Sequence, residues 1–228
     1  MPLREAMETQ RAVRRLLPDP VDDAIVLRCI ELALKAPTGS NAQSWEFVVV
    51  RDPVVKQRLA RQYRRAWRVY GAIGRRVVSR SRDASRSRDD GRSRDASQSG
   101  GASRTRRTLR AVEWQVEHFA EVPVLVVACL HGPRPPFPPV ATSSYYGSVY
   151  PSVQNLLLAA RAVGLGAALV TLPLWSTVAA RRILGLPRSV TPCCVIPLGW
   201  PRGRYGPTSR KPVGDVAHLD RFGNRPWR

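Results

Sequence analysis

Three short polar segments carry residue types that could bind a small charged molecule. Residues 10–15 read Gln-Arg-Ala-Val-Arg-Arg, and residues 208–212 read Thr-Ser-Arg-Lys-Pro. Their guanidinium forks suit a phosphate, which accepts paired hydrogen bonds from arginine. Residues 36–45 read Ala-Pro-Thr-Gly-Ser-Asn-Ala-Gln-Ser-Trp. A loop of such small and amide residues can lie flat against an aromatic ring and hydrogen-bond its polar edge.

Conventional catalytic motifs are absent from the sequence. It contains no Gly-x-Ser-x-Gly, no Walker loop, no His-Glu-x-x-His and no Gly-x-Gly-x-x-Gly. We therefore expect an enzyme of this sequence to leave the difficult chemical step to a bound cofactor. The three histidines share no helix face and the four cysteines lack the Cys-x-x-Cys spacing, so we expect no metal site.

Helices and strands that would position these segments alternate along the chain. Apolar residues at helical spacing predict helices over residues 22–36, 53–70, 109–119, 148–163 and 177–184. Apolar, β-rich runs predict strands over residues 45–51, 123–130, 166–171 and 191–198. This order indicates an α+β sheet covered by helices, in a single domain over residues 1–228.

Composition restricts the class of protein. The chain has 228 residues, of which 43% are hydrophobic, enough for one domain with a substantial core. No apolar run approaches the ~20 residues that a membrane helix needs, and the first residues lack an apolar signal core. We therefore expect no membrane association and a cytoplasmic location.

A compositionally distinct insert occupies residues 79–107. It repeats Arg-Ser-Arg-Asp and contains almost no apolar residue, so we expect it to be disordered or a loose loop. The formal charge of the chain is +20, which raises the hypothesis that this insert binds nucleic acid. Opposed neighbours such as Arg82 and Asp83 weaken that hypothesis, and nucleic acid is not the partner we expect.

Five ordered motifs resemble the nitroreductase family of FMN proteins. The family's Arg-Arg-Ser-Val-Arg element is matched by Gln-Arg-Ala-Val-Arg at residues 10–14, and its Ala-Pro-Ser-x-x-Asn-x-Gln-Pro-Trp-x-Phe pattern by residues 36–47, where Ser44 replaces the usual proline. The other three matches are Asn-Leu-x-Leu-Ala-Ala…Gly-Leu-Gly at 155–166, Leu-Gly-Leu-Pro at 184–187 and Ser-Arg-x-Pro at 209–212. The resemblance covers most of the chain outside the insert. It implies a nitroreductase-like fold with a central, mostly antiparallel sheet flanked by helices, assembled as an intertwined homodimer.

The resemblance implies FMN contacts for the two arginine-rich segments. Arg11 and Arg210 would hold the FMN phosphate, with Lys211 beside them. Arg14 would sit near the N1/C2-carbonyl edge, where a positive charge favours the anionic reduced flavin. Ala12 occupies a cofactor-contacting position at which the family has serine.

Further cofactor positions follow from the same resemblance. Pro37, Thr38 and Gly39 would pack along the isoalloxazine. Asn41 and Gln43 would hydrogen-bond the polar atoms of the ribityl chain or the ring. The strand end after Gly166, near Thr171 and Leu172, would direct a backbone N–H toward flavin N5. Aromatic residues on the acceptor side would be Tyr145, Tyr146 and Phe137.

The implied activity is that of an NAD(P)H-dependent FMN oxidoreductase. Hydride would pass by a ping-pong mechanism from NAD(P)H, through the flavin, to a small acceptor such as a nitroaromatic or quinone. The flavin would lie at the homodimer interface. Two alternatives within the fold remain, a flavin-fragmenting enzyme and a protein that sequesters FMN, and a deazaflavin remains open as the donor.

Overall fold

The computed structural model describes the backbone of residues 1–86, 96–132 and 138–228, with side chains described outside 72–104 and 133–137. Four antiparallel strands form a sheet in the order β1-β2-β4-β3. They are β1 (Trp45–Val50), β2 (Val124–His131), β3 (Gly166–Ala167) and β4 (Val190–Gly199). The predicted α+β fold with an antiparallel sheet flanked by helices is confirmed.

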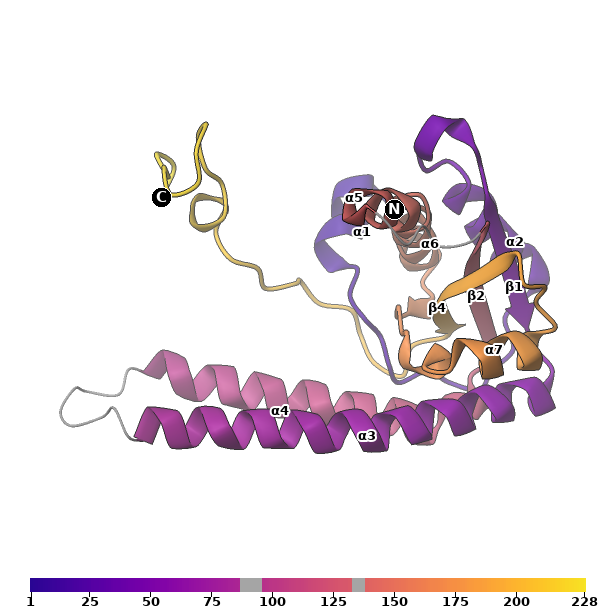
Figure 1. Ribbon diagram of the computed structural model, residues 1–228, viewed down its shortest axis with the longest axis horizontal. Helices are drawn as coiled ribbons and strands as arrows, with labels where there is room; N and C mark the ends of the chain where they lie inside the picture. The colour runs from indigo at the N-terminus through magenta and orange to yellow at the C-terminus, as the bar shows by residue number, and fades with distance from the viewer. Residues whose placement is uncertain (87–95, 133–137) are drawn as a thin grey trace.

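Strand β2 is the centre of the core because both of its faces are covered. Its alternate residues divide between two apolar clusters: Val126 and Ala128 belong to one, Leu125 and Val127 to the other. Helices α2 (Asp23–Ala33) and α6 (Tyr150–Ala162) cover the first face. The second face is covered by helices α3 (Pro53–Arg86), α4 (Ala96–Glu117) and α7 (Thr177–Leu184), as Figure 1 shows.

The remaining elements are short. They are α1 (Leu3–Thr9), α5 (Pro139–Gly147) and the single turns η1 (Gly39–Asn41), η2 (Phe119–Glu121), η3 (Leu172–Leu174) and η4 (Val213–Asp215). The strand predicted over 166–171 is interrupted: after β3 the chain makes only an isolated bridge between Val170 and Val195.

Local sequence explains where several helices begin and end. The Asp22 carboxylate accepts a hydrogen bond from the backbone N–H of Ala24 at the start of α2, and Asp52 does the same for Val54 at the start of α3. Helix α7 begins after Ser176 and ends at Gly185, whose φ of 66° is the left-handed cap that glycine favours.

The prediction of a loose loop over 79–107 is wrong for its two ends. Residues up to Arg86 continue α3, and residues from Ala96 begin α4; residues 87–95 lie outside the described residues. The two helices lie side by side in Figure 1. Extending a helix costs far less than nucleating one, and α3 is already anchored by the buried Leu59 and Tyr63, so the helix can continue into a segment rich in arginine and serine.

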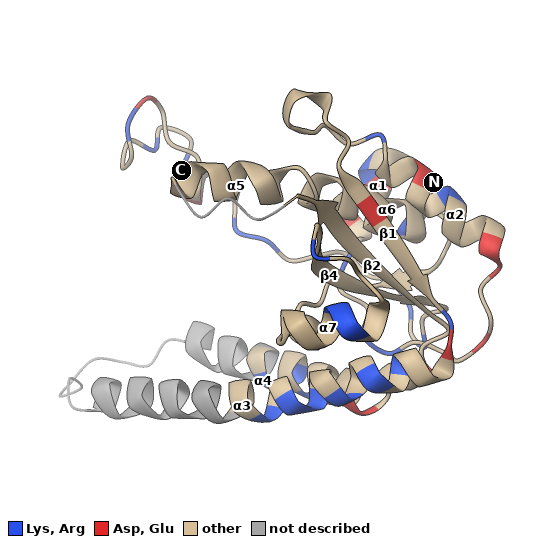
Figure 2. Cartoon of the chain, turned by 45° about the vertical axis from the view of Figure 1, so that its right-hand side comes forward, with Lys and Arg blue, Asp and Glu red and all other residues tan. Residues whose placement is uncertain are grey.

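The outward face of α3 is strongly basic. Between Pro53 and Gly71 the helix carries six cationic residues and no acidic one, and Figure 2 shows this basic row along the helix. Among the helices that the structure describes, none is both long and apolar enough to cross a membrane.

Candidate functional site

The site is built where the two ends of the chain run side by side. Residues after α1 run antiparallel to residues after β4, and the N–H of Arg202 donates to the carbonyl of Arg15 at 3.0 Å. Farther along, the N–H of Thr208 donates to the carbonyl of Glu8, near the end of α1, at 3.0 Å. The N–H of Val13 donates to the carbonyl of Ala167 in β3 at 2.9 Å. Residues 10–16 are called the N-terminal arm below, and residues 201–211 the C-terminal arm.

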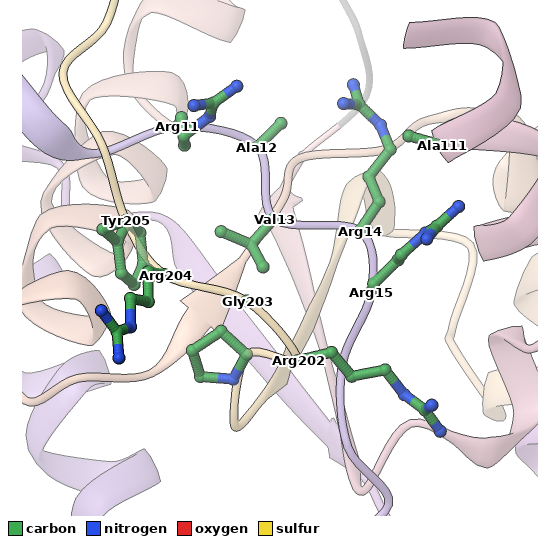
Figure 3. A pocket seen from close by; sticks show the side chains of 11 residues that line it. Arg11, Ala12, Val13, Arg14, Arg15, Ala111, Arg202, Gly203, Arg204 and Tyr205 are labelled. Carbon is green, nitrogen blue, oxygen red and sulfur yellow. The ribbon is translucent and has the colours of Figure 1, made fainter. Parts of the chain in front are cut away.

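A cavity of about 340 Å³ opens between the two arms and α4. Five arginines and no aspartate or glutamate belong to its lining. Figure 3 shows them: Arg11, Arg14, Arg15, Arg202 and Arg204. Such an uncompensated concentration of guanidinium groups favours an anionic ligand, and phosphate in particular.

Arg14 has the least solvated guanidinium of the site. Burial lowers its pKa, the neighbouring Tyr63 opposes that shift and Arg11 adds to it. Its Nε atom is buried and has no hydrogen-bond partner. A buried donor without a partner costs about 1–3 kcal/mol, which a ligand oxygen at this point would recover.

The cavity offers no acid or base suited to neutral pH. Tyr205 is the one acidic side chain among the lining residues; its hydroxyl donates to the carbonyl oxygen of Leu165, and burial raises its pKa. Elsewhere, among the described residues, no group of three or more His, Cys, Asp or Glu side chains could hold a metal ion. The lining side chains can therefore bind and polarise an anion, and electron transfer would need a bound cofactor.

The loop predicted to face the flavin lies elsewhere in the same chain. The N–H of Gly39 donates to Ser148 Oγ at 3.3 Å, and none of the loop residues lines the arginine-rich cavity. Within the loop, Ser40, Asn41 and Gln43 have φ values of 51°, 52° and 49°. Three such left-handed residues that are not glycine are strained backbone, a feature that clusters at functional sites.

Hydrogen bonds hold that loop in its strained shape. The backbone N–H of Gln43 donates to Thr38 Oγ1 at 3.2 Å, and the Gln43 side chain donates to Asn41 Oδ1 at 3.2 Å. Pro37 and Gly39 are exposed. The loop thus presents a preformed, open surface rather than a collapsed turn.

Arg210 lies apart from Arg11. It lines a different hollow, together with Met7, Glu8 and Thr208, and its guanidinium donates to the carbonyl of Ser209 at 3.0 Å. Lys211 follows it and is exposed. The structure places both on the C-terminal arm beside α1, and it does not bring them into the cavity with Arg11.

The remaining predicted residues lie outside the cavity lining. Thr171 is exposed at the start of η3, and Leu172 packs against the apolar cluster beneath α3. Tyr145 donates to the carbonyl of Gly132 at 3.0 Å, its ring meets that of Tyr146 edge-on at 5.3 Å, and both pack against the core. Phe137 lies outside the described residues.

Sequence reasoning missed Arg202, Arg204 and Tyr205. They enter the site because the C-terminal arm pairs with the N-terminal arm, a contact between residues nearly the whole chain apart. A signal was present, since Trp-Pro-Arg-Gly-Arg-Tyr directly follows the buried strand β4.

The chain belongs to the nitroreductase family, whose model matches residues 7–200. It is 44% identical over 50 residues to the NADH dehydrogenase of Thermus thermophilus, and this match covers 22% of the chain and 24% of that protein. A Methanothermobacter thermautotrophicus protein, provisionally named NADH dehydrogenase/NAD(P)H nitroreductase, is 22% identical over 100% of the chain and 88% of its own length.

The fold is also similar to that of a solved iodotyrosine deiodinase bound to FMN and 3-iodo-L-tyrosine. The TM-score is 0.70 at 20% identity, over 97% of this chain and 100% of that one. The sequence match thus covers less than a quarter of the Thermus protein, whereas the structural similarity covers the whole of the deiodinase chain.

Proposed function

We propose that this protein binds FMN beside the N-terminal arm and passes electrons from NAD(P)H to a small oxidised acceptor. The observation that carries the proposal is the acid-free, arginine-rich cavity with the unpartnered Nε of Arg14. Family membership supports it, as does the FMN held by the similar deiodinase fold.

The residues present fit FMN in charge and in hydrogen-bonding character. Arg11, exposed at the cavity, would pair with the phosphate, and Arg14 would donate to the carbonyl edge of the isoalloxazine from its partly desolvated position. FMN, when bound, supplies hydride and electron transfer. The protein contributes position and positive charge, and solvent supplies protons because the cavity lining has no suitable acid.

The proposed site needs a second copy of the chain. The strained loop with Asn41 and Gln43 lies outside the cavity of its own chain, which agrees with a flavin held between the cavity of one protomer and the loop of its partner. The C-terminal residues Val213 and Phe222 are 72% and 92% exposed, as expected of a segment that packs on a partner. A measured solution mass near that of a monomer would exclude this homodimer.

Arg210, Lys211, Thr171 and Leu172 remain proposed cofactor positions, and Tyr145 and Tyr146 remain proposed acceptor-side positions. Arg210 and Lys211 lie at the far end of the C-terminal arm, so a flavin phosphate that reaches past Arg11 would approach them. Tyr145 and Tyr146 lie near the strained loop through α5, whose Ser144 receives a hydrogen bond from Ser148.

FMN titration of site variants tests the cofactor proposal. Arg14→Gln should weaken FMN binding by roughly tenfold to a hundredfold, because it removes one charge-assisted bond of about 1.5–3 kcal/mol. Arg58→Ala, an exposed arginine of α3 outside the cavity, is the matched control and should bind FMN as the unaltered protein does. Equal affinities for all three proteins would refute the assignment of Arg14.

Steady-state kinetics test the reaction. A nitroaromatic, a quinone and 3-iodotyrosine form the acceptor panel, since the matched relatives include nitroreductase-like and deiodinase proteins. Parallel double-reciprocal lines are expected of ping-pong transfer, and intersecting lines would contradict it. Formation of dimethylbenzimidazole from reduced FMN in air would instead favour the flavin-fragmenting alternative.

A further inference from the structure

Four of the five cavity arginines form two groups, and Arg14 belongs to neither. In Figure 3, Arg11 and Arg204 lie on one side of the paired arms, and Arg15 and Arg202 lie on the other. Arg11 belongs to the first group and is the residue proposed above for the FMN phosphate. The second group is left without a ligand by every FMN contact proposed for this chain.

Arg15 and Arg202 are held together by backbone and by an aromatic ring. Their backbones pair directly, with the N–H of Arg202 donating to the carbonyl of Arg15 at 3.0 Å. Their guanidinium carbons lie 5.9 and 5.5 Å from the ring centroid of Trp114 on α4. Two like charges over one ring repel each other, and no described carboxylate pairs with either of them.

Trp114 is itself fixed in place. The His118 ring stacks on it at 4.1 Å and 8°, and His118 Nδ1 is 2.8 Å from the Trp114 carbonyl oxygen. The indole therefore serves as a rigid surface for the two guanidinium groups, which keep their hydrogen-bonding edges free. Arg110 lies one helical turn earlier on the same stripe of α4 and is also exposed.

We propose that Arg15 and Arg202, backed by Trp114, bind the 2′-phosphate of the electron donor, so that the enzyme prefers NADPH to NADH. This inference rests on the proposed function. A phosphate monoester dianion matches two adjacent arginine forks in charge and geometry. NADH presents a neutral 2′-hydroxyl at the same point and would leave the two charges uncompensated.

The ratio of kcat/KM for NADPH to that for NADH tests the inference. The unaltered holoenzyme should favour NADPH at least tenfold, and Arg202→Gln and Arg15→Gln should each lower that ratio about tenfold. Arg58→Ala, on the outer face of α3, should leave the ratio unchanged. A ratio near one in the unaltered protein, or an equal loss with both nucleotides in the variants, would overturn the inference.

Two further measurements separate this inference from the proposed function. If Arg202→Gln loses FMN, Arg202 binds the flavin phosphate and the inference fails while the function stands. If neither nucleotide supports turnover, the proposed function fails, and calorimetry still decides the phosphate site. Adenosine 2′,5′-bisphosphate should then bind about tenfold more tightly than 5′-AMP, and Arg202→Gln should abolish the difference; equal binding of the two would overturn the site.

Discussion

The guanidinium carbon of Arg161 lies 4.0 Å from the ring centroid of Tyr205. The same side chain is only 11% exposed, and its Nε donates to Thr9 Oγ1 at 2.8 Å. Arg161 thereby joins α6 to the C-terminal arm through Tyr205 and to the end of α1 through Thr9. Because α1 leads directly into the N-terminal arm and the cavity lies between the two arms, the shape of the cavity depends on Arg161, which does not line it.

Replacing Arg161 should loosen both arms. Arg161→Ala removes a cation–π contact and a charge-assisted hydrogen bond, so we expect the free energy of unfolding to fall by about 2 kcal/mol and FMN binding to weaken. Urea unfolding measures the first effect. Arg28→Ala removes an exposed pair with Glu31 and should cost less than about 0.5 kcal/mol. Equal losses in the two variants would contradict the role of Arg161.

Gly166 is packed too closely for any side chain. A Cβ atom at this position would lie 2.7 Å from Leu16 Cδ2 and 2.8 Å from Val13 Cγ1, both on the N-terminal arm. Gly166→Ala should therefore displace this arm, destabilise the protein by about 1–3 kcal/mol and weaken FMN binding. Gly147→Ala, which meets no atom within 4 Å, is the control. Wild-type thermal stability and FMN affinity in Gly166→Ala would refute this account.

Tyr63 should make the protein sensitive to alkaline pH. It is 2% exposed, and burial raises its pKa to about 12, against the opposing effect of Arg14. In the unfolded chain a tyrosine ionises near pH 10, so between pH 10 and 12 only the unfolded state loses the proton. The stabilisation is complete below pH 10 and is lost as the pH rises through 12.

Urea unfolding between pH 9 and 12 measures this effect. The buried thiols of Cys29 and Cys129, whose pKa values burial raises to about 11 and about 12, add to the same decline. Tyr63→Phe should therefore show a shallower loss of stability, by roughly 1–3 kcal/mol across the range, and not a flat profile. Identical slopes in the two proteins would show that Tyr63 does not titrate as proposed.

Local signals in the sequence were sufficient for most elements of the fold. The apolar run that became β2 is buried along nearly its whole length, and Gly185 ends α7 where the pattern placed it. The prediction of a loose loop over residues 79–107 failed at both ends because it rested on composition, whereas a helix already anchored at Leu59 can be extended at little cost. The bulge at Cys193 in β4, which falls opposite the step between Ala128 and Cys129 of β2, was equally invisible, since it depends on the register between two strands.

The site was only partly predictable for a different reason. Arg11 and Arg14 carry their signal locally, as a short arginine-rich motif. Arg202 and Trp114 acquire a role only when three distant segments meet, and nothing in their immediate sequence specifies that meeting. The separation of Asn41 from the cavity likewise depends on tertiary structure, and the proposed contribution of a second protomer to the site rests on it.

The visible absorption spectrum of the purified protein, with the chromophore identified after denaturation, tests the central claim most directly. The account predicts flavin absorption and release of FMN, without covalent attachment. A colourless protein that also fails to take up added FMN would contradict it, and would mean that the arginine-rich cavity of this nitroreductase-like fold serves a different anion.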